Sequence, residues 1–207
     1  MIDQLLDMPR PYRGQIVRLE QPPSQGSAVL ELLLARSDRP RADVRRWCIQ
    51  AQGVLEFKVV SHEVESIELT QRHPLLWTYD QDEVELYIQG QLLDVHAVIG
   101  RLQVAHETLA RGWIAFGAYF NDRTPLQVLL AAGSGLLATG PSSVISAYQK
   151  VLEAEGLQCS ALNQGSLGAL DAEPRVLILG RSYIIATEFS AQLTDQDPAH
   201  DSSGQIR

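Results

Sequence analysis

The chain has 207 residues, of which 45% are hydrophobic and 20% charged, and its net charge at pH 7 is −8. This composition is typical of a globular protein with a sizeable core, and no apolar run reaches the roughly 20 residues that span a bilayer. Most of the negative charge lies in residues 51–100, where nine acidic residues accompany two basic ones. Such a balance argues against DNA or RNA as a partner, because proteins that bind nucleic acids need a basic footprint.

The sequence predicts a cytoplasmic location. Its beginning, MIDQLLDMPRPYRG, lacks the basic start and the long apolar stretch of a signal peptide. The cysteines, Cys48 and Cys159, lie in apolar segments with no second cysteine nearby, which favours small buried residues over a disulfide or a reactive thiol. Because no apolar run is long enough to span a bilayer, we also expect no membrane partner.

The first half of the chain predicts short strands separated by clusters of Pro, Gly, Ser and Asp. In residues 83–89 (EVELYIQ), the apolar side chains of Val84, Leu86 and Ile88 alternate with Glu, Tyr and Gln. This alternation is typical of an antiparallel sheet with one buried face and one wet face. The predicted strands cover residues 14–20, 28–35, 45–51, 54–60, 66–70 and 83–89.

The second half of the chain predicts three helices and further strands. The first helix, residues 94–112, has Asp94 as its N-cap and Gly112 just past its end. The last two strands form a hairpin that turns at Gly180 and Arg181. The remaining elements are helices over residues 124–133 and 140–156, an aromatic strand or tight segment over 113–120, and strands over 156–162, 175–180 and 182–193.

Together these elements predict an α+β fold. An N-terminal antiparallel sheet or sandwich-like half of about six strands packs with a C-terminal half of about three helices and two to three further strands. We expect a single domain over residues 1–193, because no Pro/Gly/Ser-rich linker separates the two halves, and a disordered polar tail over residues 194–207. The strand-rich, helix-rich and terminal-strand parts of the domain cover residues 12–90, 91–156 and 157–193.

A Gly-rich stretch, residues 133–144 (GSGLLATGPSSV), precedes the third predicted helix. Backbone amides at a helix start bind phosphate groups, so one interpretation is an anion-binding site. However, the stretch has no Gly-Lys-Ser/Thr, its glycine spacing breaks the dinucleotide-binding pattern, and the segment before it predicts a helix. The pattern therefore favours a closely packed helix–loop–helix joint, with the anion site as the alternative. The residues of the alternative site are Gly133, Gly135, Gly140, Ser142 and Ser143.

The sequence contains no pattern that predicts a metal, a cofactor or a catalytic group. His96 and His106 are ten residues apart in one predicted helix, about 15 Å along its axis, so they cannot share a metal. The acidic run YDQDEVE lacks the Gly of a calcium loop and has Val84 at a ligand position. The G-x-S-x-G motif of serine hydrolases is absent from the sequence.

Residues 72–90 (RHPLLWTYDQDEVELYIQG) interleave large aromatic side chains with acidic ones. Interfaces favour aromatic anchors and carboxylates steer basic partners, so one hypothesis is that this segment forms an acidic hairpin that binds a basic protein surface. The pattern favours the alternative interpretation, in which Leu75, Leu76 and Trp77 fill the core of the sheet, and the acidic residues keep an edge strand from pairing with other chains. The candidate partner-binding residues are Trp77, Tyr79, Asp80, Asp82, Glu83, Glu85 and Tyr87.

Two functional classes follow from these patterns. The first, which the sequence favours, is a non-catalytic cytoplasmic binding protein that recognises another protein through the acidic aromatic segment without a cofactor. The second is an enzyme or small-molecule binder that holds an anionic group at residues 133–143 and uses His73 or His96 as acid or base.

Overall fold

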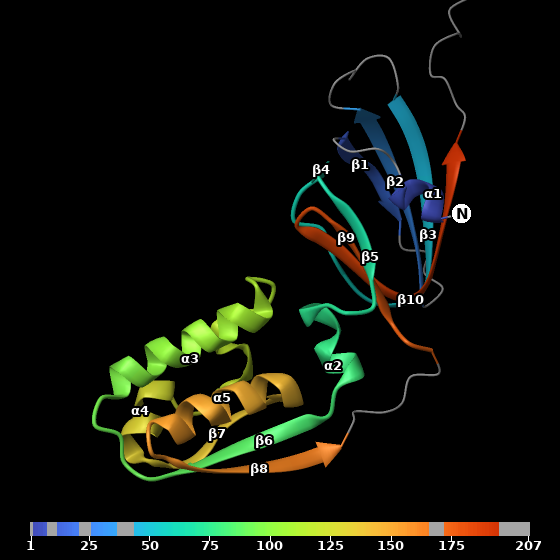
Figure 1. Ribbon diagram of the computed structural model, residues 1–207. Coiled ribbons are helices and arrows are strands. Elements are labelled where there is room, and N and C mark those ends of the chain that lie inside the picture. Colours follow the sequence, from blue (N-terminus) through green and yellow to red (C-terminus); the bar gives the residue numbers. More distant parts are fainter. Residues whose placement is uncertain (1, 8–11, 21–25, 37–43, 166–171, 195–207) are drawn as a thin grey trace, which may run out of the picture. The chain divides into compact units, whose positions relative to one another are not determined.

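The computed structural model describes residues 2–7, 12–20, 26–36, 44–165 and 172–194 (Figure 1). The expected α+β class is confirmed, because the described residues form helices together with antiparallel sheets of seven and three strands. The chain divides into two compact units by its backbone contacts. Unit 1 comprises Met1–Gln71 and Pro174–Arg207, and unit 2 comprises Arg72–Glu173.

Unit 1 contains a short helix and the seven-stranded sheet. Its elements are α1 (Ile2–Leu6), β1 (Tyr12–Glu20), β2 (Ser27–Arg36), β3 (Val44–Lys58), β4 (Glu63–Val64), β5 (Ile67–Thr70), β9 (Arg175–Leu179) and β10 (Ser182–Thr194). The strand order is β4-β1-β2-β3-β10-β9-β5, and Glu65 and Ser66 connect the two edge strands, so the sheet curls round on itself. The predicted hairpin at Gly180 is confirmed by the pairing of β9 with β10.

Strand β3 joins two of the predicted strands into one. Gly53 lies between them with φ +61°, and a Cβ at this position would lie 2.2 Å from Oγ1 of Thr187. Glycine tolerates both the positive φ and the close approach, so the strand continues through an irregular position. The pairing of β3 with β10 shifts register two residues further on, at Leu55, because Ile185 pairs with Glu56 and Ala186 with Val54.

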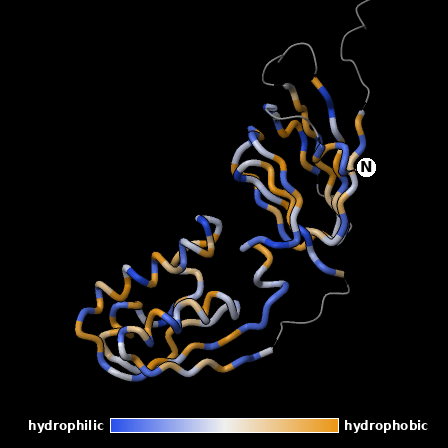
Figure 2. The backbone as a smooth tube through the Cα atoms, in the orientation of Figure 1, coloured by the Kyte–Doolittle hydropathy of each residue, from blue (hydrophilic) through white to orange (hydrophobic). Residues whose placement is uncertain are grey.

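The core of unit 1 lies on one face of its sheet. Leu30, Leu32 and Leu34 alternate along β2 and are fully buried, as period-two patterning requires. Figure 2 shows hydrophobic and hydrophilic residues alternating along the strands of this unit. Ile2 and Leu5 of α1 belong to the same buried cluster, so the short helix packs against this face of the sheet.

Unit 2 packs three helices over one face of the three-stranded sheet (Figure 1). Its elements are η1 (Pro74–Leu76), α2 (Trp77–Asp80), β6 (Glu83–Gln89), α3 (Val95–Ala110), η2 (Phe116–Tyr119), α4 (Leu126–Ala132), β7 (Ser134–Pro141), α5 (Ser142–Ala154) and β8 (Gln158–Gly165). Strand β6 lies between β7 and β8. Its alternation is confirmed, because Val84, Leu86 and Ile88 are buried in the core with the helices.

The three predicted helices are confirmed as α3, α4 and α5. Asp94 caps α3 as predicted, with its carboxylate accepting a hydrogen bond from the amide of Ala97 at 3.0 Å. Among the described residues, no helix is long and apolar enough to cross a membrane. Thr194 ends β10, and residues 195–207 of the predicted disordered tail lie outside the described part of the chain.

Two elements of unit 2 differ from the sequence prediction. Strand β6, expected in the N-terminal sheet, pairs instead with β7 and β8 from the second half of the chain. The Gly-rich stretch, expected as a loop between two helices, forms strand β7. Local periodicity does not reveal these pairings, because a strand's partner depends on contacts between residues that are distant in sequence.

The buried hydrophobic residues form two clusters, one in each unit. The division into units does not follow the predicted change from strands to helices near residue 90, because unit 1 includes the last two strands of the chain. The expected single domain over residues 1–193 stays a prediction.

Gly133 is the glycine of unit 2 whose replacement we expect to cost most. Its φ is +68°, and a Cβ there would lie 1.9 Å from the carbonyl oxygen of Gly90. Gly156 has a φ of +85° but open space around it, so it is the matched control. We predict that Gly156→Ala lowers the free energy of unfolding by about 1–2 kcal/mol, the cost of a left-handed alanine. Gly133→Ala should cost about 1–3 kcal/mol more, because the backbone must move.

Urea denaturation of both variants measures this difference. Equal losses of stability in the two variants would contradict the close approach of Gly133 to Gly90.

Candidate functional site

The acidic segment is a helix-to-strand junction rather than a hairpin. Residues 74–80 form η1 and then α2, and the chain enters β6 at Glu83. The predicted hairpin is therefore wrong, because the segment before β6 is helical and the partners of β6 are β7 and β8. Of the three residues that the alternative interpretation placed in the core of the sheet, Trp77 is half-buried and packs against the core of unit 2, whereas Leu76 is buried outside that cluster. The edge strand of that interpretation is wrong, because β6 is the central strand of its sheet.

The seven candidate residues form what we call the acidic aromatic surface: Trp77, Tyr79, Asp80, Asp82, Glu83, Glu85 and Tyr87. The first three lie on α2, and the last three lie on β6. Asp80 and Asp82 are exposed and the other five are half-buried. Desolvation raises the pKa of the Asp80 carboxyl, partly offset by a backbone hydrogen bond. The sequence has no Lys or Arg between Arg72 and Arg101, so these carboxylates have no basic neighbour along the chain.

The strand part of this surface is tied together by hydrogen bonds. The Tyr87 hydroxyl donates to Oε2 of Glu85 at 2.9 Å, and the Gln164 amide of β8 donates to the same oxygen at 3.2 Å. The hydrogen bond to Glu85 raises the pKa of Tyr87, since it favours the protonated phenol. The side chains of Glu85 and Tyr87 are therefore held in defined positions on the face of the sheet opposite the buried face.

Asp82 connects three elements of unit 2. Its backbone carbonyl accepts a hydrogen bond from the amide of Ser142 at 3.0 Å, at the start of α5. Its carboxylate accepts a hydrogen bond from the Asn163 amide of β8 at 2.8 Å. These contacts hold the start of β6 against both α5 and β8.

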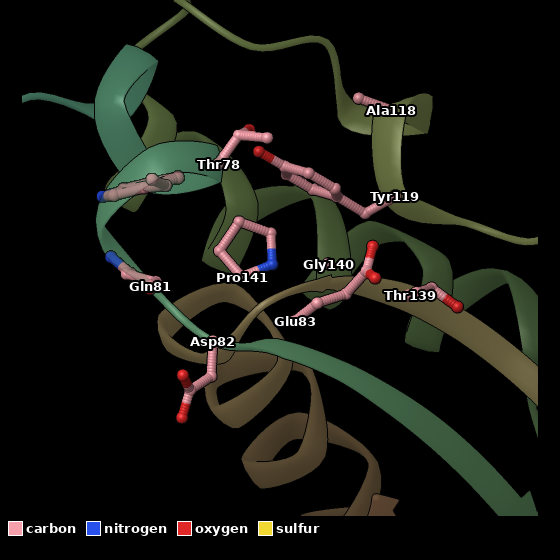
Figure 3. Close-up of a pocket in the computed structure, with 10 residues that line it drawn as sticks. Thr78, Gln81, Asp82, Glu83, Ala118, Tyr119, Thr139, Gly140 and Pro141 are labelled. Carbon is pink, nitrogen blue, oxygen red and sulfur yellow. The ribbon is translucent and has the colours of Figure 1, made fainter. Parts of the chain in front are cut away.

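A pocket of about 200 Å³ opens beside this junction (Figure 3). Trp77 and Thr78 of α2, Glu83 of β6, Tyr119 of η2 and Gly140 of β7 contribute to its wall. Figure 3 shows the carboxylate of Glu83 directed towards Tyr119, whereas the carboxylate of Asp82 points away from it. The pocket lining therefore combines the aromatic residues Trp77 and Tyr119 with the acidic residues Asp82 and Glu83.

Tyr119 shapes the pocket because Gly140 leaves room for its ring. A Cβ on Gly140 would lie 2.6 Å from Cδ1 of Tyr119, so a larger residue would displace the ring. Desolvation by burial raises the pKa of Tyr119 to about 12, so its hydroxyl stays protonated at neutral pH. Tyr119 and Gln81, which also lines the pocket, are site residues that the sequence analysis missed. A glycine within a strand often marks a close approach, but the strand at Gly140 was not predicted from the sequence, so this signal was not available for Tyr119.

The backbone amides at the start of α5, which the anion-binding alternative would use, already donate hydrogen bonds within the fold. The amide of Ser143 donates to Oε1 of Gln81 at 3.0 Å, and the amide of Ser142 donates to the carbonyl of Asp82. A side-chain carbonyl thus caps α5 where a phosphate would bind.

The glycines of that alternative have structural roles. Gly133 ends α4 in a left-handed conformation, and Gly135 has a φ of +128° at the beginning of β7. Together with the ring contact of Gly140, these roles account for the Gly-rich composition without a ligand. The anion site itself stays a prediction.

The two histidines of the enzyme alternative lie apart from the pocket lining. His73 caps η1 through Nδ1, which accepts a hydrogen bond from the amide of Leu75 at 3.3 Å, and its ring packs edge-on against Trp113. His96 is exposed on α3. His106 has a structural role: it is buried, its Nδ1 lies 2.8 Å from the hydroxyl of Tyr148, and its Nε2 lies 2.9 Å from the Ile114 carbonyl.

Comparison of the chain with protein-family models, with curated proteins and with solved structures found no match.

We predict that Gln81→Ala lowers the free energy of unfolding by about 0.5–2 kcal/mol, because the Ser143 amide loses its cap. Gln103→Ala, an exposed position on α3, is the matched control and should change stability by less than about 0.5 kcal/mol. Chemical denaturation measures both changes, and equal stability of the two variants would contradict the capping role.

Inorganic phosphate should leave the melting temperature of the unaltered chain unchanged, whereas a rise would support the anion-binding alternative.

Proposed function

We propose that this chain is a non-catalytic binding protein that recognises a basic protein partner through the acidic aromatic surface of unit 2. The observation that carries the proposal is the concentration of four carboxylates, Asp80, Asp82, Glu83 and Glu85, beside three large aromatic residues on one helix-to-strand junction. Aromatic side chains supply most of the binding energy at many interfaces, and charged residues raise the rate of association with a partner of opposite charge.

The charge of the whole unit supports this proposal. Between residues 72 and 173 the sequence has eleven acidic and five basic residues, so the unit carries an excess of negative charge. Such a field attracts a basic partner over a distance that salt shortens, to about 10 Å at 0.1 M ionic strength. Binding should therefore weaken as the salt concentration rises.

The hydrogen bonds within the surface also support binding. Glu85 is held by Tyr87 and Gln164, and Asp82 is held by Asn163. Side chains that are already ordered lose less conformational entropy when a partner binds, which leaves more of the interaction energy for affinity. A preformed surface of this kind suits recognition of a folded partner.

The size of the pocket favours this function over the small-molecule alternative. Pockets for drug-sized ligands usually measure about 300–1,000 Å³. The pocket beside Trp77 measures about 200 Å³, which suits one side chain of a partner better than a whole metabolite.

Charge reversal outside the pocket tests the proposal. We predict that the double variant Asp80→Lys/Glu85→Lys retains at least about tenfold less of a basic partner from a cell extract. The reason is that two carboxylates of the acidic aromatic surface are replaced by ammonium groups, which repel a basic partner. Glu107→Lys/Asp122→Lys changes the net charge of the same unit by the same amount at exposed positions away from the surface, and it should bind normally. Quantitative mass spectrometry of the retained proteins provides the measurement.

Two results would contradict the proposed function. One is the same set of retained proteins on the unaltered chain and on both variants. The other is an equal loss from both variants, which would show that binding depends on net charge rather than on this surface.

A further inference from the structure

The pocket beside Trp77 has a carboxylate that the fold leaves available. Among the described residues, no hydrogen bond or ion pair engages the carboxylate of Glu83, whereas the neighbouring Asp82 and Glu85 both accept side-chain hydrogen bonds. Glu83 is half-buried and lines the pocket, so a group that enters the pocket meets this negative charge. An anion would be repelled there, and a cation would be attracted.

The rest of the pocket lining also suits a cation. Trp77 and Tyr119 contribute aromatic rings, and the face of such a ring attracts a cation within about 6 Å. Thr78 and Tyr119 both line the pocket, and the hydroxyl of each can accept a hydrogen bond. The pocket lining thus offers the Glu83 carboxylate, two hydroxyl acceptors and two rings to a single positively charged group.

We propose that the pocket binds the guanidinium group of an arginine side chain presented by the basic partner. The inference rests on the proposed function, since it identifies the side chain that the partner inserts. Guanidinium is planar, carries five N–H donors, stacks on aromatic rings and binds carboxylates through two parallel hydrogen bonds. A lysine ammonium has three donors and no flat face, so it uses fewer of the acceptors and rings of this pocket.

Blocked amino acids test the inference on the full-length chain. Nα-acetylarginine N-methylamide is the probe, and Nα-acetylcitrulline N-methylamide is its neutral control of nearly the same shape. The indole N–H signal of Trp77 in the nuclear magnetic resonance spectrum reports binding, because Trp77 lines the pocket. We predict a saturable shift of this signal with the arginine probe and at least about tenfold weaker binding of the citrulline control, which lacks the charge-assisted hydrogen bonds.

Two variants localise the site. Glu83→Gln should weaken binding of the arginine probe at least about fivefold, because the pocket loses the carboxylate that has no hydrogen-bond partner among the described residues. Glu107→Gln removes an exposed carboxylate of α3 that belongs neither to the pocket lining nor to the acidic aromatic surface, and it should bind within about twofold of the unaltered chain. The spectrum of each free variant shows whether its fold is preserved.

Three results would overturn the inference: an unmoved Trp77 signal, equal binding of the arginine and citrulline probes, or equal effects of the two variants. Free arginine that binds more than about tenfold more tightly than the blocked probe would also overturn it, in favour of an amino-acid ligand.

If the arginine probe fails while Asp80→Lys/Glu85→Lys still abolishes partner retention, the inference is wrong and the proposed function stands. If the probe binds while that double variant retains the partner normally, the proposed function is wrong.

Discussion

The pairing of β6 with a strand on each side is the constraint on which the rest of unit 2 depends. As the central strand, β6 has its backbone hydrogen-bonding groups engaged by β7 and β8, so its side chains can point only to the two faces of the sheet. Val84, Leu86 and Ile88 are buried with the helices. Glu83 and Glu85 consequently occupy the alternate positions, and a slip of one residue would exchange the two sets.

The junction before β6 extends this order to the pocket. Gln81 caps α5, and Asp82 contacts both α5 and β8, so the turn between α2 and β6 is held at two consecutive residues. This arrangement places Trp77 beside Glu83, and the small residue Gly140 brings the ring of Tyr119 to the same pocket. The proposed binding of an arginine side chain therefore depends on contacts that also stabilise the fold.

Local sequence patterns predicted most elements, but not their partners. The alternation in β6 and the cap at Asp94 were predictable because each depends on residues within a few positions of one another. The Gly-rich strand β7 was not, because glycine is depleted in strands and its partner β6 lies about fifty residues earlier. Four of the seven residues of the acidic aromatic surface do not line the pocket, whereas Gln81 and Tyr119, which the sequence did not indicate, do line it. Which residues line the pocket depends on contacts between segments that are distant in sequence.

Amide chemical shifts show directly whether a basic partner binds at the acidic aromatic surface. The measurement is made on the isotope-labelled full-length chain while an unlabelled basic partner, retained in the extract experiment, is added. We expect the shift changes to centre on residues 77–87 and to diminish as salt is added, because carboxylates of this surface attract the partner. Changes confined to unit 1, with residues 77–87 unaffected, would contradict this expectation.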